Sequence, residues 1–256
     1  MSSRGLEGVV VAQTELSRID GEKGRLIYRG YEIEDLAEHA TFEEVCHLLW
    51  FGELPNEKQL ADLRAKLAEA REVHPDIIEM LRRLPKDTHP MAALRTAASM
   101  LASYDPDAED MSDEANVRKA IRLTAQLSTL TAAFARLREG KEPVAPRTDL
   151  GLAANFLYML TGEEPDELAS RIMDVAFILH AEHGMNASTF SARVTVATLS
   201  DMHSGVTSAI GTLKGPLHGG ANERVMKVLS EVGEPGKAEA WGRAAVGAYS
   251  PKARSM

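Results

Sequence analysis

The segment DELASRIMDVAFILHAEHGMNAST, residues 166–189, is the clearest indication of fold class in this sequence. Its apolar residues recur every three to four positions from Leu168 to Leu179, which is the spacing of an α-helix. Because this helix is unusually apolar around Ile172 to Leu179, we expect it to be central and buried. Similar helical spacing continues through most of the chain on either side. We therefore predict about eleven helices and a mainly α fold in which neighbouring helices pack on one another.

The beginning of the chain follows a different pattern. Two short runs of β-branched or aromatic residues, Val9–Val11 and Leu26–Tyr28, flank the turn-forming residues Asp20, Gly21 and Gly24. Together they predict a short N-terminal β-hairpin.

Local signals predict where several helices begin and end. Thr41 and Glu44 have the spacing of a capping box, and Ser112 can cap a long helix. Gly52 and Gly162 follow apolar helical runs, so each is expected to end a helix.

Composition and charge limit the classes of function. The chain has 256 residues and a formal net charge of −9, so its overall field disfavours nucleic acid and anionic membrane surfaces as partners. No run of about 18 apolar residues predicts a membrane helix, and residues 1–10 do not resemble a signal peptide, so we expect a cytoplasmic protein. Cys46 is the one cysteine, which excludes an internal disulfide framework and a cysteine-rich zinc site.

The polar end of the opening segment is the first candidate site. We expect the helix to run through His180 and His183 to Gly184, so that both imidazoles share one face. Asn186 and Ser188 can cap the next helix, whose free N–H groups favour an anion. Two alternatives are a pair of histidines that only stabilises a helix end, and a metal half-site. The metal half-site lacks a sure third ligand and the His-Glu-x-x-His order of a metal helix, so we do not expect a metal.

A second candidate site is Gly215-Pro-Leu-His-Gly-Gly-Ala-Asn222, which places His218 among glycines between two helices. Glycines let the backbone approach a ligand closely, and the helix near Asn222 offers further N–H groups. The alternative is a helix corner with an incidental histidine. We expect His183 and His218 to face a shared cleft that suits a small anion. Four further histidines are expected to be surface or half-buried: His39, His47, His74 and His203.

These two segments resemble the two central signatures of the citrate synthase family, bacterial type. Further matches extend the resemblance from residue 5 to about residue 241. They are Gly5-Leu-Glu-Gly-Val9, Ile19-Asp-Gly21, Tyr28-Arg-Gly-Tyr31, Glu43-Glu44, His89-Pro-Met91, Leu94-Arg-Thr96 and Ala153-Ala-Asn-Phe-Leu157. The resemblance implies a mainly helical homodimer that condenses oxaloacetate with acetyl-CoA. It implies no metal and no cofactor beyond the coenzyme A thioester substrate.

The same resemblance implies a role for each candidate residue. His183 is expected to bind oxaloacetate, with help from Asn186. His218 is expected to be a neutral imidazole that donates a hydrogen bond to the thioester carbonyl oxygen as the enol forms. Ser188 is expected to orient His218, and Asn222 is expected to support the site.

The resemblance also implies a large helical domain over residues 1–220 and the start of a small domain over 221–256. The family's third signature, a Gly-x-Gly-His segment leading to Asp-Pro-Arg and then to an aspartate base, has no match here. Ser250-Pro-Lys-Ala-Arg254 is only faintly similar to it. We therefore expect a C-terminally truncated chain with only a remnant of the small domain and no detectable activity. The alternatives are a 2-methylcitrate synthase that takes propionyl-CoA, and a non-catalytic helical protein that dimerises.

Overall fold

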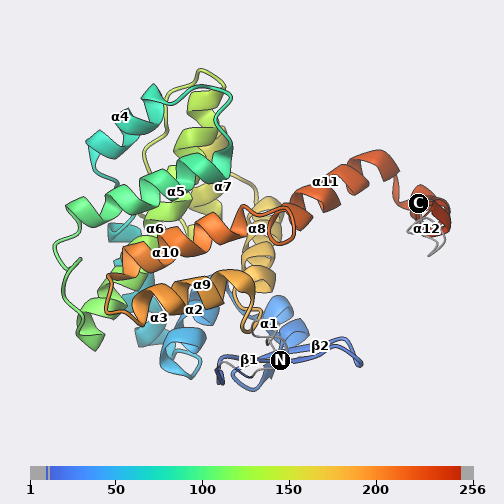
Figure 1. The fold of residues 1–256 in the computed structure, drawn as a ribbon, viewed down its shortest axis with the longest axis horizontal. Helices are drawn as coiled ribbons and strands as arrows, with labels where there is room; N and C mark the ends of the chain where they lie inside the picture. Colours follow the sequence, from blue (N-terminus) through green and yellow to red (C-terminus); the bar gives the residue numbers. More distant parts are fainter. Residues whose placement is uncertain (1–9, 11, 249–256) are drawn as a thin grey trace, which may run out of the picture. The chain divides into compact units, whose positions relative to one another are not determined.

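The computed structural model describes residue 10 and residues 12–248, apart from the side chains of residues 221–225, 235 and 245–248. Within that part, helices dominate and the only sheet has three short strands (Figure 1). The prediction of a mainly α fold is confirmed. Backbone contacts divide the chain into two compact units, Met1–Thr212 and Leu213–Met256. The predicted domain boundary after residue 220 lies farther along the chain and stays a prediction.

The strands are β1 (Ser17–Asp20), β2 (Arg25–Tyr28) and β3 (Tyr31–Glu32). The α-helices of the described part are α1 (Ile33–His39), α2 (Phe42–Phe51), α3 (Glu57–Glu69), α4 (Pro75–Arg83), α5 (Pro90–Leu101), α6 (Asp113–Arg138), α7 (Leu152–Thr161), α8 (Glu167–His180), α9 (Ala187–Val196), α10 (Met202–Leu213), α11 (Gly220–Val232) and α12 (Ala238–Ala248). Two short 3₁₀ helices are η1 (Ala102–Tyr104) and η2 (Pro235–Lys237).

The N-terminal hairpin is present, but its first strand was misplaced by the sequence pattern. β1 pairs with β2 antiparallel, with Asp20 opposite Arg25. The intervening loop is closed by the N–H of Lys23, which donates to Asp20 Oδ1 at 3.1 Å. Hairpin strands adjoin their turn, so the strand lies at 17–20 rather than at 9–11. Val10 is exposed and lies in no strand, while Val9 and Val11 fall outside the described residues, as does the 5–9 motif.

A two-residue turn joins β2 to β3 and directs one tyrosine inwards. Arg29 and Gly30 have φ values of 46° and 95°, and Tyr28 pairs with Tyr31 across them. Positive φ at both central residues is the type I′ geometry that matches the twist of a hairpin. The Tyr28 side chain is fully buried and packs in a cluster that includes Leu48 and Ile178. The hairpin is thus attached to α8 through a buried ring.

The predicted helix boundaries are confirmed where the signal is local. The Glu44 carboxylate accepts hydrogen bonds from the backbone N–H (2.7 Å) and hydroxyl (2.6 Å) of Thr41 at the start of α2. Ser112 caps α6 through its side chain. Gly52 and Gly162 end α2 and α7 in the left-handed conformation. These signals depend on residues no more than a few positions apart, so they can be identified without the tertiary structure.

The long helix α6, and not α8, is the central element of the first unit. It packs against α3, α4, α5 and α7. One buried cluster joins α4, α5 and α6, and a second joins α2, α3, α6 and α7. The first unit is therefore organised around residues 113–138.

The expectation that α8 is central and buried is wrong for much of its surface. Ile178 is fully buried against the hairpin and α1–α2, but Leu168 and Ile172 are 69% and 61% exposed. Leu179 is also exposed. A count of apolar residues shows that a helix has apolar sides but does not show which of them another element covers.

Candidate functional site

The helix that carries the first candidate site ends earlier than expected. α8 stops at His180, and residues 181–186 form a non-helical connection before α9 begins at Ala187. His183 therefore lies in a loop. The prediction that His180 and His183 share a helix face is wrong.

A tyrosine hydroxyl accounts for this early stop. In a continuing α-helix, the N–H of Glu182 would donate to the carbonyl of Ile178. Instead the Tyr28 hydroxyl donates to Ile178 O at 3.2 Å and accepts the Glu182 N–H at 3.2 Å. The Ala181 N–H completes a tighter turn on the same carbonyl at 3.2 Å. One buried side chain thus replaces the next hydrogen bond of the helix.

The Glu182 side chain holds the loop that follows. Its Oε1 accepts a hydrogen bond from the Ser17 hydroxyl at 3.0 Å and from the Gly184 N–H at 2.5 Å. Gly184 has a φ of 65°, a left-handed conformation that favours glycine. The loop is therefore fixed both to itself and to strand β1.

The contacts of His183 define which ring nitrogen is free for chemistry. Its Nε2 lies 2.9 Å from the carbonyl oxygen of Leu179. A carbonyl oxygen only accepts hydrogen bonds, so Nε2 carries a hydrogen and donates it. The ring is exposed, which leaves Nδ1 as the atom that can meet a ligand. His180 contacts the carbonyl of Ala176 in the same way, through Nδ1 at 2.7 Å.

The predicted cap of the next helix is confirmed. Asn186 Oδ1 accepts the N–H of Thr189 at 3.0 Å, which starts α9. Ser188 lies in the first turn of α9, and that turn contains no acidic residue. The positive end of the helix dipole is therefore not offset by a carboxylate of its own first turn, which suits an anion near residues 183–188.

The second unit carries the other candidate histidine in the turn 214–219. The His218 N–H donates to Gly215 O at 3.0 Å. A Cβ on Gly219 would lie 2.4 Å from the carbonyl oxygen of Leu213, so only glycine fits there. Asn222 lies in α11, but its side chain falls outside the described part, as does the 250–254 segment.

The structure groups the predicted residues by unit. His183, Asn186 and Ser188 belong to the first unit, and His218 and Asn222 belong to the second. The expected shared cleft, the expected contact of Ser188 with His218 and the role of Asn222 stay predictions. Among the described residues, no group of three or more histidine, cysteine, aspartate or glutamate side chains could hold a metal ion. Over the same residues, no helix is long and apolar enough to cross a bilayer.

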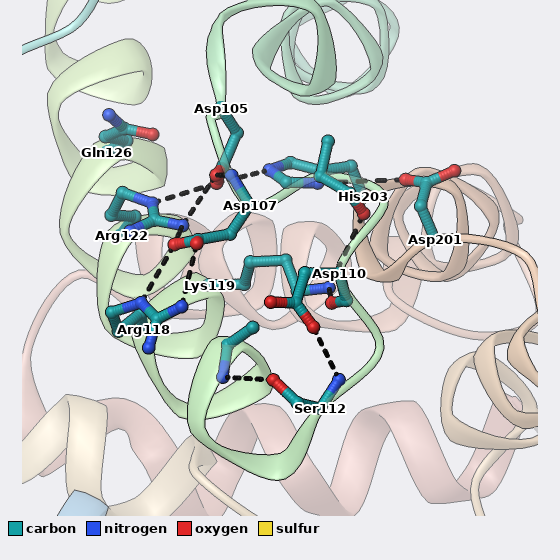
Figure 2. A network of polar contacts seen from close by, with 12 residues as sticks. Asp105, Asp107, Asp110, Ser112, Arg118, Lys119, Arg122, Gln126, Asp201 and His203 are labelled. Atoms are coloured by element: carbon teal, nitrogen blue, oxygen red, sulfur yellow. Dashed lines mark hydrogen bonds and ion pairs between the residues drawn. The ribbon is translucent and has the colours of Figure 1, made fainter.

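Sequence reasoning missed two buried histidines. His47 in α2 is buried, so its expected surface or half-buried position is wrong, and its Nδ1 lies 2.8 Å from the carbonyl oxygen of Glu53. His203, in the first turn of α10, is fully buried, so its expected surface or half-buried position is wrong. Its Nε2 lies 3.2 Å from Asp105 Oδ2 and its Nδ1 lies 3.7 Å from Asp201 Oδ1 (Figure 2). Burial lowers the pKa of His203 despite these two carboxylates. The spacing of Asp201 and His203 gave no signal of burial because Asp105 lies far away in the sequence.

A network of ion pairs surrounds His203. Arg122 on α6 binds Asp105 through two nitrogens, at 2.9 and 2.5 Å, and Arg118 binds Asp107 at 3.0 and 2.7 Å (Figure 2). Hydrogen bonds from Arg118 and Arg122 hold the pKa of Asp107 well below its usual range. The network joins the connection between α5 and α6 to the start of α10.

Comparison with known proteins shows which family this chain resembles. The family profile "Citrate synthase, C-terminal domain" matches residues 5–250. Citrate synthase 2 of Bacillus subtilis is 54% identical over 244 residues, which cover 95% of this chain and 65% of that protein. A 2-methylcitrate synthase of Mycobacterium tuberculosis is 46% identical and is matched over 94% of this chain and 61% of its own length.

The fold of the chain also superposes on a solved structure. The ternary complex of citrate synthase from Thermoplasma acidophilum with carboxymethyl coenzyme A and oxaloacetate superposes with a TM-score of 0.86 at 32% identity. The match covers 94% of this chain and 63% of that one. The chain therefore belongs to the citrate synthase family. It spans 61–65% of the length of these relatives.

Proposed function

We propose that these residues form part of a site for the condensation of acetyl-CoA with oxaloacetate, a reaction in which one water is consumed and citrate and free coenzyme A are formed. The family membership supports this proposal, as does the structural neighbour that holds oxaloacetate and a coenzyme A derivative. The observation that carries it is the 181–188 segment. There an exposed histidine lies a few residues before the start of a helix whose first turn has no acidic residue.

In this proposal His183 and the start of α9 bind oxaloacetate. Nε2 of His183 already donates to Leu179 O, so the ring meets the substrate through Nδ1. When Nδ1 is protonated, the imidazolium and the backbone N–H groups of the first turn of α9 both favour a dianion. Asn186 contributes by fixing that first turn.

His218 is the proposed donor to the thioester carbonyl. The pKa of the α-C–H group of an acetyl thioester lies roughly fifteen units above the pKa of a carboxylic acid. Transfer of this proton to a carboxylate is therefore uphill by about 20 kcal/mol. A hydrogen bond donated by a neutral imidazole to the developing enolate oxygen lowers this cost. The enol carbon then attacks the ketone carbon of oxaloacetate, and hydrolysis of the thioester releases coenzyme A.

The proposal assigns no general base to these residues, because the sequence has no match to the family's third signature. Loss of a general base lowers rates by about 10²–10⁴. We therefore propose that purified 1–256 binds oxaloacetate but releases no measurable thiol from acetyl-CoA. Thiol release that depends on oxaloacetate would overturn this part of the proposal.

Calorimetry with oxaloacetate tests the binding role. Wild-type protein is compared with His183→Gln and with His39→Gln, which changes an exposed histidine at the end of α1. Saturable binding that weakens at least about tenfold in His183→Gln, and is unchanged in His39→Gln, supports the proposal. Equal binding by wild type and His183→Gln, or no binding by folded wild type, overturns it.

The 2-methylcitrate synthase relative favours a second candidate function, in which the acyl group is propionyl. Titration with acetyl-CoA and propionyl-CoA in the presence of oxaloacetate separates the two substrates, because the preferred thioester binds more tightly. Tighter binding of propionyl-CoA would replace the first proposal with the second.

The proposal also includes a cytoplasmic homodimer that needs no metal or other cofactor. The single, buried cysteine is consistent with a reducing compartment. Sedimentation as a monomer at micromolar concentration would contradict the dimer. A dimer that binds neither substrate would instead favour the non-catalytic alternative.

A further inference from the structure

We propose that the N-terminal hairpin is a positioning part of the oxaloacetate site, with Tyr28 as its positioning residue. The inference rests on the proposed function, because it concerns how His183 is presented to the substrate. In this inference the Tyr28 hydroxyl ends α8 at His180, and His183 therefore lies in a loop. Ser17 and Glu182 hold the same loop through a second set of hydrogen bonds, and we call these three residues the positioning group.

The position of the Tyr28 hydroxyl is fixed by packing and by turn geometry. The ring is fully buried in the cluster that also contains Leu36 and Ile178. The type I′ turn at Arg29 and Gly30 directly follows Tyr28 and restrains the backbone at the end of β2. A side chain restrained in this way presents its hydroxyl at one place, between Ile178 O and the Glu182 N–H, each at 3.2 Å.

The register of the hairpin places a second donor beside the first. Ser17 is the cross-strand partner of Tyr28, and side chains of directly opposed residues lie on the same face of a hairpin. The Ser17 hydroxyl donates to Glu182 Oε1 at 3.0 Å, and that oxygen also accepts the Gly184 N–H. Tyr28 therefore holds the backbone of Glu182 while Ser17 holds its side chain.

His183 lies between the two residues that the positioning group restrains. Glu182 is held on its N-terminal side and Gly184 on its C-terminal side, while its own ring is held by Leu179 O. If the Tyr28 hydroxyl is absent, the direct bond from the Glu182 N–H to Ile178 O becomes the natural replacement, which adds residues to α8. His183 would then move onto the helix, out of the loop that leads to Asn186.

Removal of the Tyr28 hydroxyl alone tests the positioning group. Tyr28→Phe keeps the buried ring, and Tyr31→Phe is the matched control, since Tyr31 lies in the same sheet with an exposed side chain. The readouts are oxaloacetate affinity by calorimetry, amide hydrogen exchange of peptides that cover 181–186, and the melting temperature. We expect Tyr28→Phe to bind oxaloacetate about tenfold more weakly and to change exchange at 181–186 by about tenfold. Tyr31→Phe should match wild type in both.

The outcomes separate this inference from the proposed function. If Tyr28→Phe melts earlier but keeps wild-type affinity and exchange at 181–186 while folded, its role is only structural and the inference is overturned. If wild type does not bind oxaloacetate, the proposed function fails, and unchanged exchange at 181–186 would then overturn the positioning claim independently.

A milder variant covers the case in which Tyr28→Phe does not fold. Ser17→Ala removes the donor to Glu182 from a partly buried strand position and leaves the Tyr28 hydroxyl in place. We expect a change of the same kind and a few-fold in size. Wild-type affinity and exchange in Ser17→Ala would overturn the inference.

Discussion

Two arginines with nearly the same hydrogen-bond geometry should differ strongly in what they contribute to stability. Arg122 binds Asp105 through Nε and Nη2 at 2.9 and 2.5 Å, and Arg82 binds Glu142 through Nη1 and Nη2 at 2.7 and 2.6 Å. The difference lies in burial. The side chains of Arg122 and Asp105 are 22% and 4% exposed, whereas those of Arg82 and Glu142 are 40% and 76% exposed.

Substitution of each arginine by methionine keeps an apolar stem and removes the charge. In Arg122→Met the buried Asp105 carboxylate loses its cation, and removal of one partner of a buried pair costs about 3 kcal/mol. With a urea m value of about 3 kcal/mol per molar, the unfolding midpoint should fall by about 1 M. Arg82→Met should leave the midpoint unchanged within error, because solvent already screens that pair.

Urea unfolding at pH 7 provides the assay, with Trp50 fluorescence and far-ultraviolet circular dichroism as two probes. All proteins carry Trp241→Phe, because Trp241 would add fluorescence from the second unit. Trp50 lies in α2, so its signal reports on the first unit, which holds both arginines. Equal midpoint losses in the two variants, or a loss in Arg122→Met within error of zero, would refute the argument from burial.

Three further predictions use single residues. Cys46 is buried and burial raises the pKa of its thiol, so a thiol reagent should label it only at the rate of unfolding, and fast labelling of folded protein would contradict this. The pKa of His203 is lowered in the folded state. Between that lowered pKa and a pH of about 6.5, the folded protein therefore binds fewer protons than the unfolded protein. The free energy of unfolding should fall as the pH drops through this range. His203→Phe should flatten this slope in urea unfolding at several pH values while exposed His39→Gln keeps it, and identical slopes would refute the prediction. Gly219→Ala should distort the 214–219 turn, because the new methyl group meets Leu213 O, and an unchanged circular dichroism melt would show that the turn tolerates it.

The sequence was sufficient for features set by neighbouring residues. The cap at Thr41, the stop at Gly52 and the cap at Asn186 each need a hydrogen bond or a backbone angle within a few residues. The candidate residues of the 181–188 segment were also identified from the sequence, because glycine, asparagine and histidine at the junction of two helices form a local pattern.

Features set by distant residues could not be predicted. The end of α8 depends on Tyr28, which is 154 positions from Glu182 in the sequence. The burial of His203 depends on Asp105, and the exposure of Leu168 depends on which elements cover α8. In each case a contact between separate elements overrides the local pattern, so periodicity and capping rules give the wrong boundary or the wrong burial.

A crystal structure of the chain after soaking the crystals with oxaloacetate would show whether the exposed His183 and the start of α9 bind this substrate. We expect oxaloacetate density with a carboxylate or carbonyl oxygen within hydrogen-bond distance of His183 Nδ1, while Nε2 still donates to Leu179 O. Density for oxaloacetate at another place, with His183 making no contact to it, would contradict the account.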